Sequence, residues 1–172
     1  MSANLNYGNY IQDNLPQSDN CINEKYCENN DPLLCASSGG FYQWDELMTF
    51  LTADNLSAEG KQGLCPPEWH VPGETDWADL ENFYLGEGLA GWSMLDMNIQ
   101  FGFHAKTPGI FYQNSLWAFV PPGFSAAMFW TSTVNPRSNT RVFAHGVNEI
   151  NASVSKYFST RGNALQVRCV KD

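Results

Sequence analysis

The spacing of hydrophobic residues in the first half of the chain predicts two helices. Within residues 39–55, Trp44, Leu47, Met48 and Leu51 recur at intervals of three and four positions. This spacing places the four side chains on one face of a helix. The opposite face of that helix is expected to lie in solvent.

The same periodicity recurs within residues 72–88, where Trp77, Leu80 and Tyr84 align on one face. Two glycines follow Tyr84 within four positions, and they are expected to end the helix because glycine favours helix ends. The segment that joins the two predicted helices contains prolines, which exclude a helix there.

After residue 90 the pattern changes to short β-rich segments separated by Gly, Pro, Asn or Ser. No further helix is predicted there. Helices followed by strands, rather than alternating with them, predict the α+β class, with two helices in the N-terminal half and short antiparallel strands in the C-terminal half. A length of 172 residues predicts a single domain, residues 1–172. The predicted strands lie within residues 115–122, 127–133, 140–147, 151–158 and 164–172.

Composition and charge narrow the possible partners. The chain is 43% hydrophobic and 16% charged, and its net charge is −9. Because this charge repels nucleic acids and anionic membranes, neither is expected as a partner. Six of the nine basic residues nevertheless follow Thr133, which indicates either a basic C-terminal sheet packed on an acidic body or a locally positive ligand surface. These six are Arg137, Arg141, Lys156, Arg161, Arg168 and Lys171.

The sequence contains no run of 18 apolar residues, so membrane insertion is not expected. Residues 1–14 lack the charged and apolar regions of a signal peptide. Two alternatives remain open: the chain begins after a cleavage site, or the protein leaves its cell by another route, as a virion component does. The expected location is extracellular, on a cell surface or a virion surface.

The five cysteines favour disulfide bonds over a metal site. Their spacing contains no CxxC pair, which disfavours a zinc ribbon. Cys27 and Cys35 flank turn-forming residues, so a local disulfide between them is expected. Cys65 and Cys169 would then connect the middle of the chain to the last strand. Cys21 is left over, either free or paired between molecules.

Catalytic and metal-binding motifs are absent from the sequence. None of the three histidines has a metal-ligand spacing, and no nucleophile elbow or phosphate-binding loop occurs. The glycine-containing residues 86–91 are interpreted as a loop. We therefore expect no enzymatic activity, no cofactor and no metal ligands. The acidic side chains of the two predicted helices are expected to lie mostly on solvent faces; they are Asp45, Glu46, Asp76, Asp79 and Glu81.

Five separated motifs carry a resemblance to a known family. In their order along the chain they resemble the Fibrobacter succinogenes major paralogous domain family, from Met1 to Asp172. The motifs are MSANLNY at residues 1–7, CENNDPLLCASSGGFYQWDELM at 27–48, GLCPPEWHVPGETDW at 63–77, FWTST at 129–133 and LQVRCVKD at 165–172.

That family is similar in fold to C-type lectins and to formylglycine-generating enzymes. The resemblance implies a C-type-lectin-like fold with two helices, several strands and paired N- and C-terminal strands. It does not imply calcium-dependent sugar binding, because the EPN, QPD and WND motifs are absent. Asn135 and Pro136 form an Asn-Pro step, but Arg137 follows it rather than a carboxylate.

Domains with this type of closing strand also resemble the variable proteins of diversity-generating retroelements. In those systems, error-prone copying at adenines rewrites codons just upstream of the closing strand, and it never produces Met, Trp, Gln, Lys or Glu from the usual Asn codons. Between Val134 and Asn163 these types occur at Glu149 and Lys156 alone, against about a fifth of the preceding positions. A polar β-region would itself be poor in Met and Trp, which explains part of the depletion. The 134–163 segment is the predicted diversified ligand-binding face.

The preferred hypothesis is a ligand-binding domain that displays this hypervariable face to a protein or glycan target on another cell or host. The alternative is a non-diversified adhesion or structural module of the same family. Val142, Val147 and Val154 are predicted to point inward, whereas Gly146 and Ile150 are interpreted as products of rewriting. The predicted ligand contacts are Arg137, Asn139, Arg141, Phe143, Ala144, Asn148, Asn151, Ser153, Ser155, Tyr157, Phe158 and Ser159.

Overall fold

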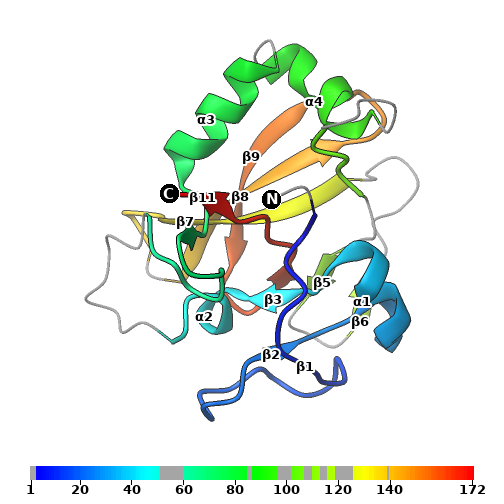
Figure 1. The fold of residues 1–172 in the computed structure, drawn as a ribbon, viewed down its shortest axis with the longest axis vertical. Coiled ribbons are helices and arrows are strands. Elements are labelled where there is room, and N and C mark those ends of the chain that lie inside the picture. Colours follow the sequence, from blue (N-terminus) through cyan, green and yellow to red (C-terminus); the bar gives the residue numbers. More distant parts are fainter. Residues whose placement is uncertain are drawn as a thin grey trace.

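The computed structural model has a mixed α+β fold, as predicted (Figure 1). It describes residues 3–50, 60–84, 87–96, 102–106, 110–112, 116–118, 126–138 and 140–172. The helices are α1 (Pro32–Ser38), α2 (Trp44–Leu47), α3 (Glu74–Phe83) and α4 (Glu87–Leu95), with a 3-10 turn at Glu28–Asn30. The strands are β1 (Asn9–Tyr10), β2 (Glu24–Lys25), β3 (Tyr42–Gln43), β4 (Trp69–His70), β5 (Ile110–Tyr112), β6 (Leu116–Ala118), β7 (Ala126–Val134), β8 (Arg141–Asn148), β9 (Val154–Thr160), β10 (Ala164–Leu165) and β11 (Val170–Lys171).

The longest strands form an antiparallel sheet in the order β7, β8, β9. A second sheet has the order β3, β10, β5, β6. The last strand, β11, pairs with β4, and β1 pairs with β2. In Figure 1, α3 and α4 lie beside the β7–β8–β9 sheet, whereas α1, β1 and β2 lie below it.

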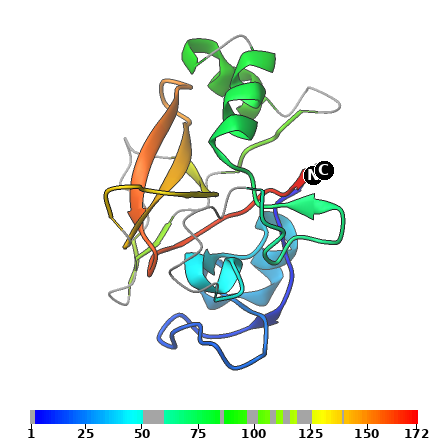
Figure 2. The same ribbon diagram turned by 90° about the vertical axis from the view of Figure 1, so that its left-hand side faces the viewer.

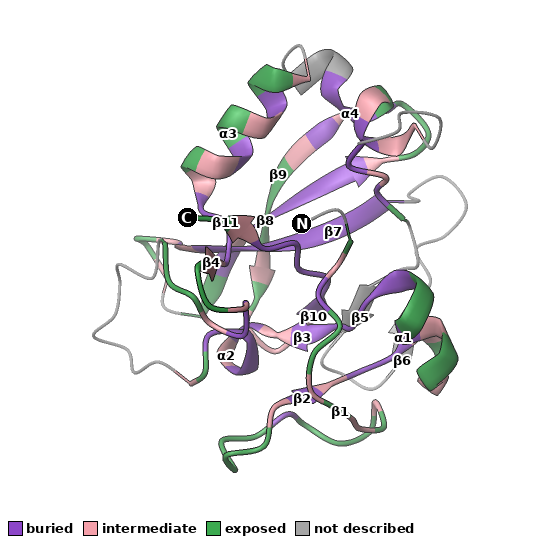
Figure 3. Cartoon of the chain, viewed as in Figure 1, coloured by how far each residue is buried: buried purple, intermediate pink, exposed green. Residues whose placement is uncertain are grey.

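The β7–β8–β9 sheet is covered on both faces along most of β7 and β8 (Figure 3). On one face, Trp130 and Val142 join a hydrophobic cluster with Trp44. On the other face, Phe129 packs in a second cluster with Trp77 of α3. Because side chains alternate along a strand, consecutive residues of β7 contribute to two separate cores.

Two helices confirm the sequence prediction in part. Helix α3 lies where the Trp77 periodicity predicted it. Helix α2 lies within the predicted range 39–55 but ends at Leu47, because Thr49 and Phe50 adopt positive φ angles of 56° and 52°. Both values lie in the left-handed region, which cannot continue a right-handed helix. The remainder of that predicted helix lies outside the described residues.

Two helices were not predicted. Helix α1 begins with Pro32 at its first position and is capped by the Asp31 side chain, which accepts from the Leu33 amide. Helix α4 contradicts the loop predicted for residues 86–91 and the expected absence of helices after residue 90. A Cβ at Gly91 would overlap the carbonyl of Ala152, so this glycine permits close packing of α4. Gly88, which was expected to end a helix, lies within α4.

The predicted strands at residues 127–133, 140–147 and 151–158 are confirmed as β7, β8 and β9, with ends shifted by one to three residues. Segment 164–172 contains two short strands rather than one. Within the described ranges, no helix is both long enough and apolar enough to cross a bilayer.

Two disulfides and a hydrogen bond between the terminal segments hold these elements together, whereas the expected pairing of N- and C-terminal strands is not found among the described strands, because β1 pairs with β2 and β11 with β4. Cys27 is bonded to Cys35, and Cys65 to Cys169, as expected. Cys21 is free and exposed. Near the two ends of the chain, the Leu5 amide donates to the Val167 carbonyl at 2.8 Å.

The two disulfides are expected to contribute unequally to stability. Their sequence separations are 104 residues for Cys65–Cys169 and 8 for Cys27–Cys35. In the chain-entropy model the longer loop is worth about 4.7 kcal/mol and the shorter about 2.5 kcal/mol. Replacing both cysteines of the long bridge with Ala should therefore lower the free energy of unfolding by about 2 kcal/mol more than replacing both of the short bridge. Urea unfolding measures this difference, with Cys21→Ser as the neutral control, and equal losses would contradict it.

Candidate binding face

The β8–β9 hairpin places most of the predicted contact residues at or near the surface. Strand β9 is the outermost element of its sheet (Figure 2). The exposed fractions of Tyr157 and Phe158 are 41% and 55%. Arg137, Arg141 and Asn151 are also exposed. Partly exposed are Phe143, Asn148, Ser153, Ser155 and Ser159.

One predicted contact is wrong, and the interpretation of a neighbouring residue changes. Ala144 is fully buried and belongs to the cluster around Trp130, so it cannot contact a ligand. Gly146 has a packing role, because a Cβ there would lie 2.7 Å from Met128 Sδ and 2.7 Å from the Tyr157 ring. A ring that crosses a strand at this position requires glycine beneath it. Asn139 lies outside the described residues.

The inward orientation predicted for three valines is confirmed. Val142 and Val147 are fully buried, and Val154 is buried as well. Val142 packs with the first cluster, whereas Val147 and Val154 pack with the second. The two cores therefore fix both sides of the hairpin.

Polar residues in the hairpin turn have structural partners. The Asn148 side-chain oxygen accepts from the amides of Ile150 at 2.8 Å and Asn151 at 3.2 Å. The Asn151 oxygen in turn accepts from the amide and hydroxyl of Ser153. These bonds resemble the side-chain turns that Asn favours. Three predicted contacts thus also hold the turn.

Aromatic and basic groups meet on the face of β9 that is turned towards α3. Phe143 and Phe158 are cross-strand partners with ring centroids 4.7 Å apart. Lys156 Nζ lies 3.6 Å from the centroid of the Phe143 ring and 2.5 Å from Glu74 Oε2. The ammonium group is therefore held against the sheet by a ring and a carboxylate.

A buried polar cluster joins this face to α3. His145 stacks on Trp77 with ring centroids 4.5 Å apart. Its Nε2 lies 3.2 Å from Glu74 Oε1, and its Nδ1 lies 3.1 Å from Glu81 Oε1. The expectation that helix carboxylates lie in solvent is wrong for Glu81, which is 7% exposed. Spacing could have indicated this, because residues 74, 77 and 81 share one helix face.

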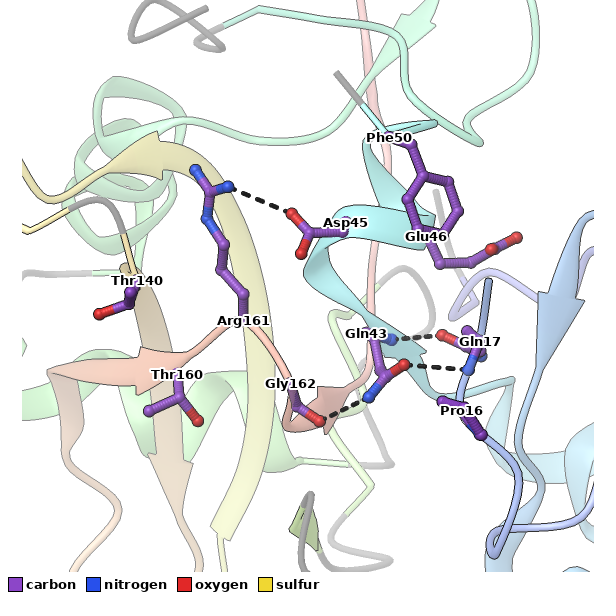
Figure 4. Close-up of a pocket in the computed structure, with 10 residues that line it drawn as sticks. All are labelled: Pro16, Gln17, Gln43, Asp45, Glu46, Phe50, Thr140, Thr160, Arg161 and Gly162. Carbon is purple, nitrogen blue, oxygen red and sulfur yellow. Dashed lines mark hydrogen bonds and ion pairs between the residues drawn. The ribbon is translucent and has the colours of Figure 1, made fainter. Parts of the chain in front are cut away.

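A polar cleft of about 590 Å³ adjoins the other end of the hairpin (Figure 4). Arg161 lies on one side of it, with Nη1 3.2 Å from Asp45 Oδ1 and the guanidinium 4.3 Å from the Trp44 ring centroid. Gln43 lies on the other side, where it pairs with Gln17 and donates to the Gly162 carbonyl at 2.8 Å. The cleft is lined by Pro16, Gln17, Gln43, Asp45, Glu46, Phe50, Thr140, Thr160, Arg161 and Gly162.

Glu46 is a second helix carboxylate that is buried against expectation. It is 3% exposed, and its Oε1 accepts from the Glu24 amide at 2.8 Å. Desolvation by burial raises the pKa of Glu46 to about 7, and the nearby charges of Glu24 and Asp19 act in the same direction. Oε2 has no hydrogen-bond partner among the described residues. Glu46 therefore gains and loses a proton near neutral pH.

No group of three His, Cys, Asp or Glu side chains within the described ranges is arranged to hold a metal ion. The arrangement instead offers exposed aromatic rings, arginines and hydroxyls around an edge strand. Aromatic and arginine side chains of this kind are enriched at recognition surfaces.

These features define a disulfide-bonded α+β domain with an exposed hairpin supported by two cores. The chain matches the model of the Fibrobacter succinogenes major domain over residues 1–171, and it therefore belongs to that family. No curated protein matches the chain, and no solved structure does.

The Glu74 cluster should make stability depend on acid pH. Burial acts to raise the pKa of Glu74, but the hydrogen bonds from His145 and Lys156 and their charges outweigh it, so the pKa is lowered. A carboxyl with a lowered pKa stabilises the fold above its unfolded pKa, and this contribution is lost as the pH falls through the folded value. Glu74→Gln should thus cost about 1 to 2 kcal/mol near pH 7 and almost nothing near pH 2. Unfolding measured across this range, with exposed Asp79→Asn as control, tests the sign; a constant loss would contradict it.

Glu46 should show the opposite dependence. Because its folded pKa is raised to about 7, its contribution is most favourable below the unfolded value near 4.5 and is lost as the pH rises through 7. Relative to the unsubstituted protein, Glu46→Gln should gain stability on the order of 2 kcal/mol between pH 4.5 and pH 8. Urea unfolding at the two pH values measures this gain. A parallel pH response of the two proteins would show that the pKa of Glu46 is not raised by folding.

Proposed function

We propose that this chain is a ligand-binding domain with a C-type-lectin-like fold, whose 134–163 segment displays a diversified surface to a target on another cell or host. In this proposal it is the variable protein of a diversity-generating retroelement, and it acts extracellularly, on a cell surface or on a virion. The target is a protein or a glycan. Binding involves neither catalysis nor nucleic acid.

The observation that carries the proposal is the contrast between the two strands of the hairpin. Strand β8 is buried along most of its length, whereas Tyr157 and Phe158 of the neighbouring β9 are exposed on opposite faces. Surface substitutions usually change stability by less than about 0.5 kcal/mol. A sequence that varies on β9 would therefore leave the scaffold intact, which is what a diversified binding site requires.

Lys156 and its contacts support the assignment of fixed and variable positions. Lysine is a type that rewriting of Asn codons does not produce, so Lys156 should be constant. Its ammonium group is paired with Glu74 and lies over Phe143, which gives the side chain a structural reason to persist. Val142 and Val147, although of permitted types, are expected to be constant for a similar reason, since both are fully buried.

The proposed C-type-lectin-like fold rests on the family and on the arrangement of the chain ends. The Leu5 amide donates to Val167, and Arg168 donates to the Asn4 side chain. The resemblance implies paired N- and C-terminal strands, and these hydrogen bonds join the two terminal segments although β1 pairs with β2 and β11 with β4.

A non-diversified adhesion or structural module of the same family is the second candidate. It is favoured by the residues of the segment that have internal roles, namely buried Ala144, the Gly146 packing site and the Asn148 turn. These roles reduce the number of positions that are free to vary. In this alternative the same face binds one constant partner.

The two candidates differ in their genomic DNA. Diversification predicts that codons for the exposed residues Arg137, Arg141, Asn151, Tyr157 and Phe158 end in C or T. It also predicts a nearby, almost identical copy with adenines at these sites, beside a reverse-transcriptase gene. Sequencing the locus tests this, and the absence of such a copy would favour the constant module.

Stability should distinguish the face from the core beneath it. Replacing Arg141, Tyr157 and Phe158 together with Ala should lower the free energy of unfolding by no more than about 1.5 kcal/mol, at about 0.5 kcal/mol per surface site. Val147→Ala, which removes buried methyl groups one strand away, should alone cost about 2 kcal/mol. Urea unfolding of both variants compares them. A larger loss from the triple variant than from Val147→Ala would mean that the proposed face belongs to the core.

A further inference from the structure

Among the described residues, no strand pairs with the outer edge of β9. This strand is the last of its sheet and pairs with β8 through seven consecutive residue pairs, from Arg141–Thr160 to Val147–Val154. The register shows no bulge along this length. The outer side of β9 is therefore a regular, extended edge.

The hydrogen bonds at both ends of the hairpin identify which backbone groups face outward. The Asn148 amide donates to the Ser153 carbonyl at 2.9 Å, and the Arg161 amide donates to the Thr140 carbonyl at 3.2 Å. Hydrogen-bonded pairs alternate along an antiparallel ladder, so residues 155, 157 and 159 face β8. The amides and carbonyls of Lys156 and Phe158 consequently point away from the sheet. No backbone hydrogen bond of these two residues to any other described segment is present.

The usual protections of an edge strand are weak here. Strand β9 contains neither proline nor glycine, and a lysine is its one charged residue. Edge lysines normally project across the edge and repel an approaching strand. Lys156 instead lies over Phe143 and pairs with Glu74, so its charge is directed back towards α3. Exposed Tyr157 and Phe158 leave apolar surface on both sides of the free backbone.

Charge indicates what kind of strand would fit beside β9. Arg137 and Arg141 are exposed at the start of the hairpin, and neither guanidinium has an ion-pair partner within the described ranges. Arg141 is the cross-strand partner of Thr160, the last residue of β9, so an acidic segment beside β9 would find this charge near one end of the edge. A second copy of this chain is a poorer occupant, because its own β9 contains a lysine and no acidic residue that could meet an arginine.

We propose that β9 binds an extended, acidic segment of a partner protein as an additional strand, through the outward amides and carbonyls of Lys156 and Phe158. This inference rests on the proposed binding function and specifies its mode and its partner. Strand addition takes affinity from main-chain hydrogen bonds and specificity from alternate side chains. Main-chain hydrogen bonds do not depend on the identity of the side chains, so a site whose side chains are rewritten keeps this part of its binding free energy.

The experiment uses a library of linear nine-residue peptides displayed on phage, selected against the full chain and then measured as synthetic peptides. The enriched peptides should contain Asp or Glu near one end. Phe158→Pro removes the outward amide hydrogen, and Phe158→Ala loses the same ring but keeps that hydrogen, so it is the matched control. Binding should be about tenfold weaker for Phe158→Pro than for Phe158→Ala, the ratio that corresponds to one lost hydrogen bond.

A second measurement does not depend on the folding of a variant. N-methylation of alternate amides on one edge of the best peptide should weaken binding to the unsubstituted chain about tenfold, whereas N-methylation of the other edge should not, because one edge alone faces β9.

Three results would overturn the inference. The first is a selection that yields no acidic peptide. The second is equal binding of the peptide to the Phe158→Pro and Phe158→Ala variants, together with no effect of N-methylation. The third is dimerisation of the chain on size-exclusion chromatography that depends on Phe158. If binding then depends on the Arg141 and Tyr157 side chains but not on the β9 backbone, strand addition fails and the binding face stands. If the genome lacks the adenine-containing copy but Phe158→Pro still weakens peptide binding, the diversification proposal fails and strand addition stands.

Discussion

The burial of β8 on both faces is the constraint on which the rest of the structure depends. One face of this strand packs with Trp130 and Trp44, and the other lies under Trp77 of α3. Dense packing on both sides leaves little freedom for sequence change within β8. It also fixes the position of β9, which is attached to β8 by a full ladder and otherwise meets solvent along one side. Because β8 is held rigidly, substitutions of exposed residues in β9 would leave the sheet in place.

The polar cluster between α3 and the sheet adds orientation to this packing. His145 and Lys156 occupy neighbouring strands, and both contact Glu74. Buried polar groups are costly unless they are paired, so such a cluster tolerates few alternative arrangements. The cluster holds α3 against β8 and β9. At the opposite end of the hairpin, Arg161 holds α2 through its contacts with Asp45 and Trp44.

The features that the sequence could predict are those with a local cause. Periodicity placed α3, β-branched and aromatic runs placed β7 to β9, and the turn-forming residues between Cys27 and Cys35 indicated the disulfide that joins them. Helix α4 was missed because glycine normally disfavours a helix, and the reason for Gly91 is its approach to Ala152, far away in sequence. Burial of Ala144 was missed for a related reason: alternation along a strand identifies two faces, but it cannot indicate that both are covered. Five of the twelve predicted contacts are exposed, as expected from their place before the closing strand. The roles of Asn148 and Asn151 in the turn depend on hydrogen bonds that become visible in three dimensions.

The chain ends lie together on the side of the molecule opposite β9 (Figure 2). The Leu5–Val167 hydrogen bond and the Cys65–Cys169 bridge hold the terminal segments to the body on that side. Whatever is joined to either end, whether a support, a tag or another polypeptide, will therefore be held behind the molecule. Immobilisation through a terminus would therefore leave β9 on the side of the molecule that is turned away from the support.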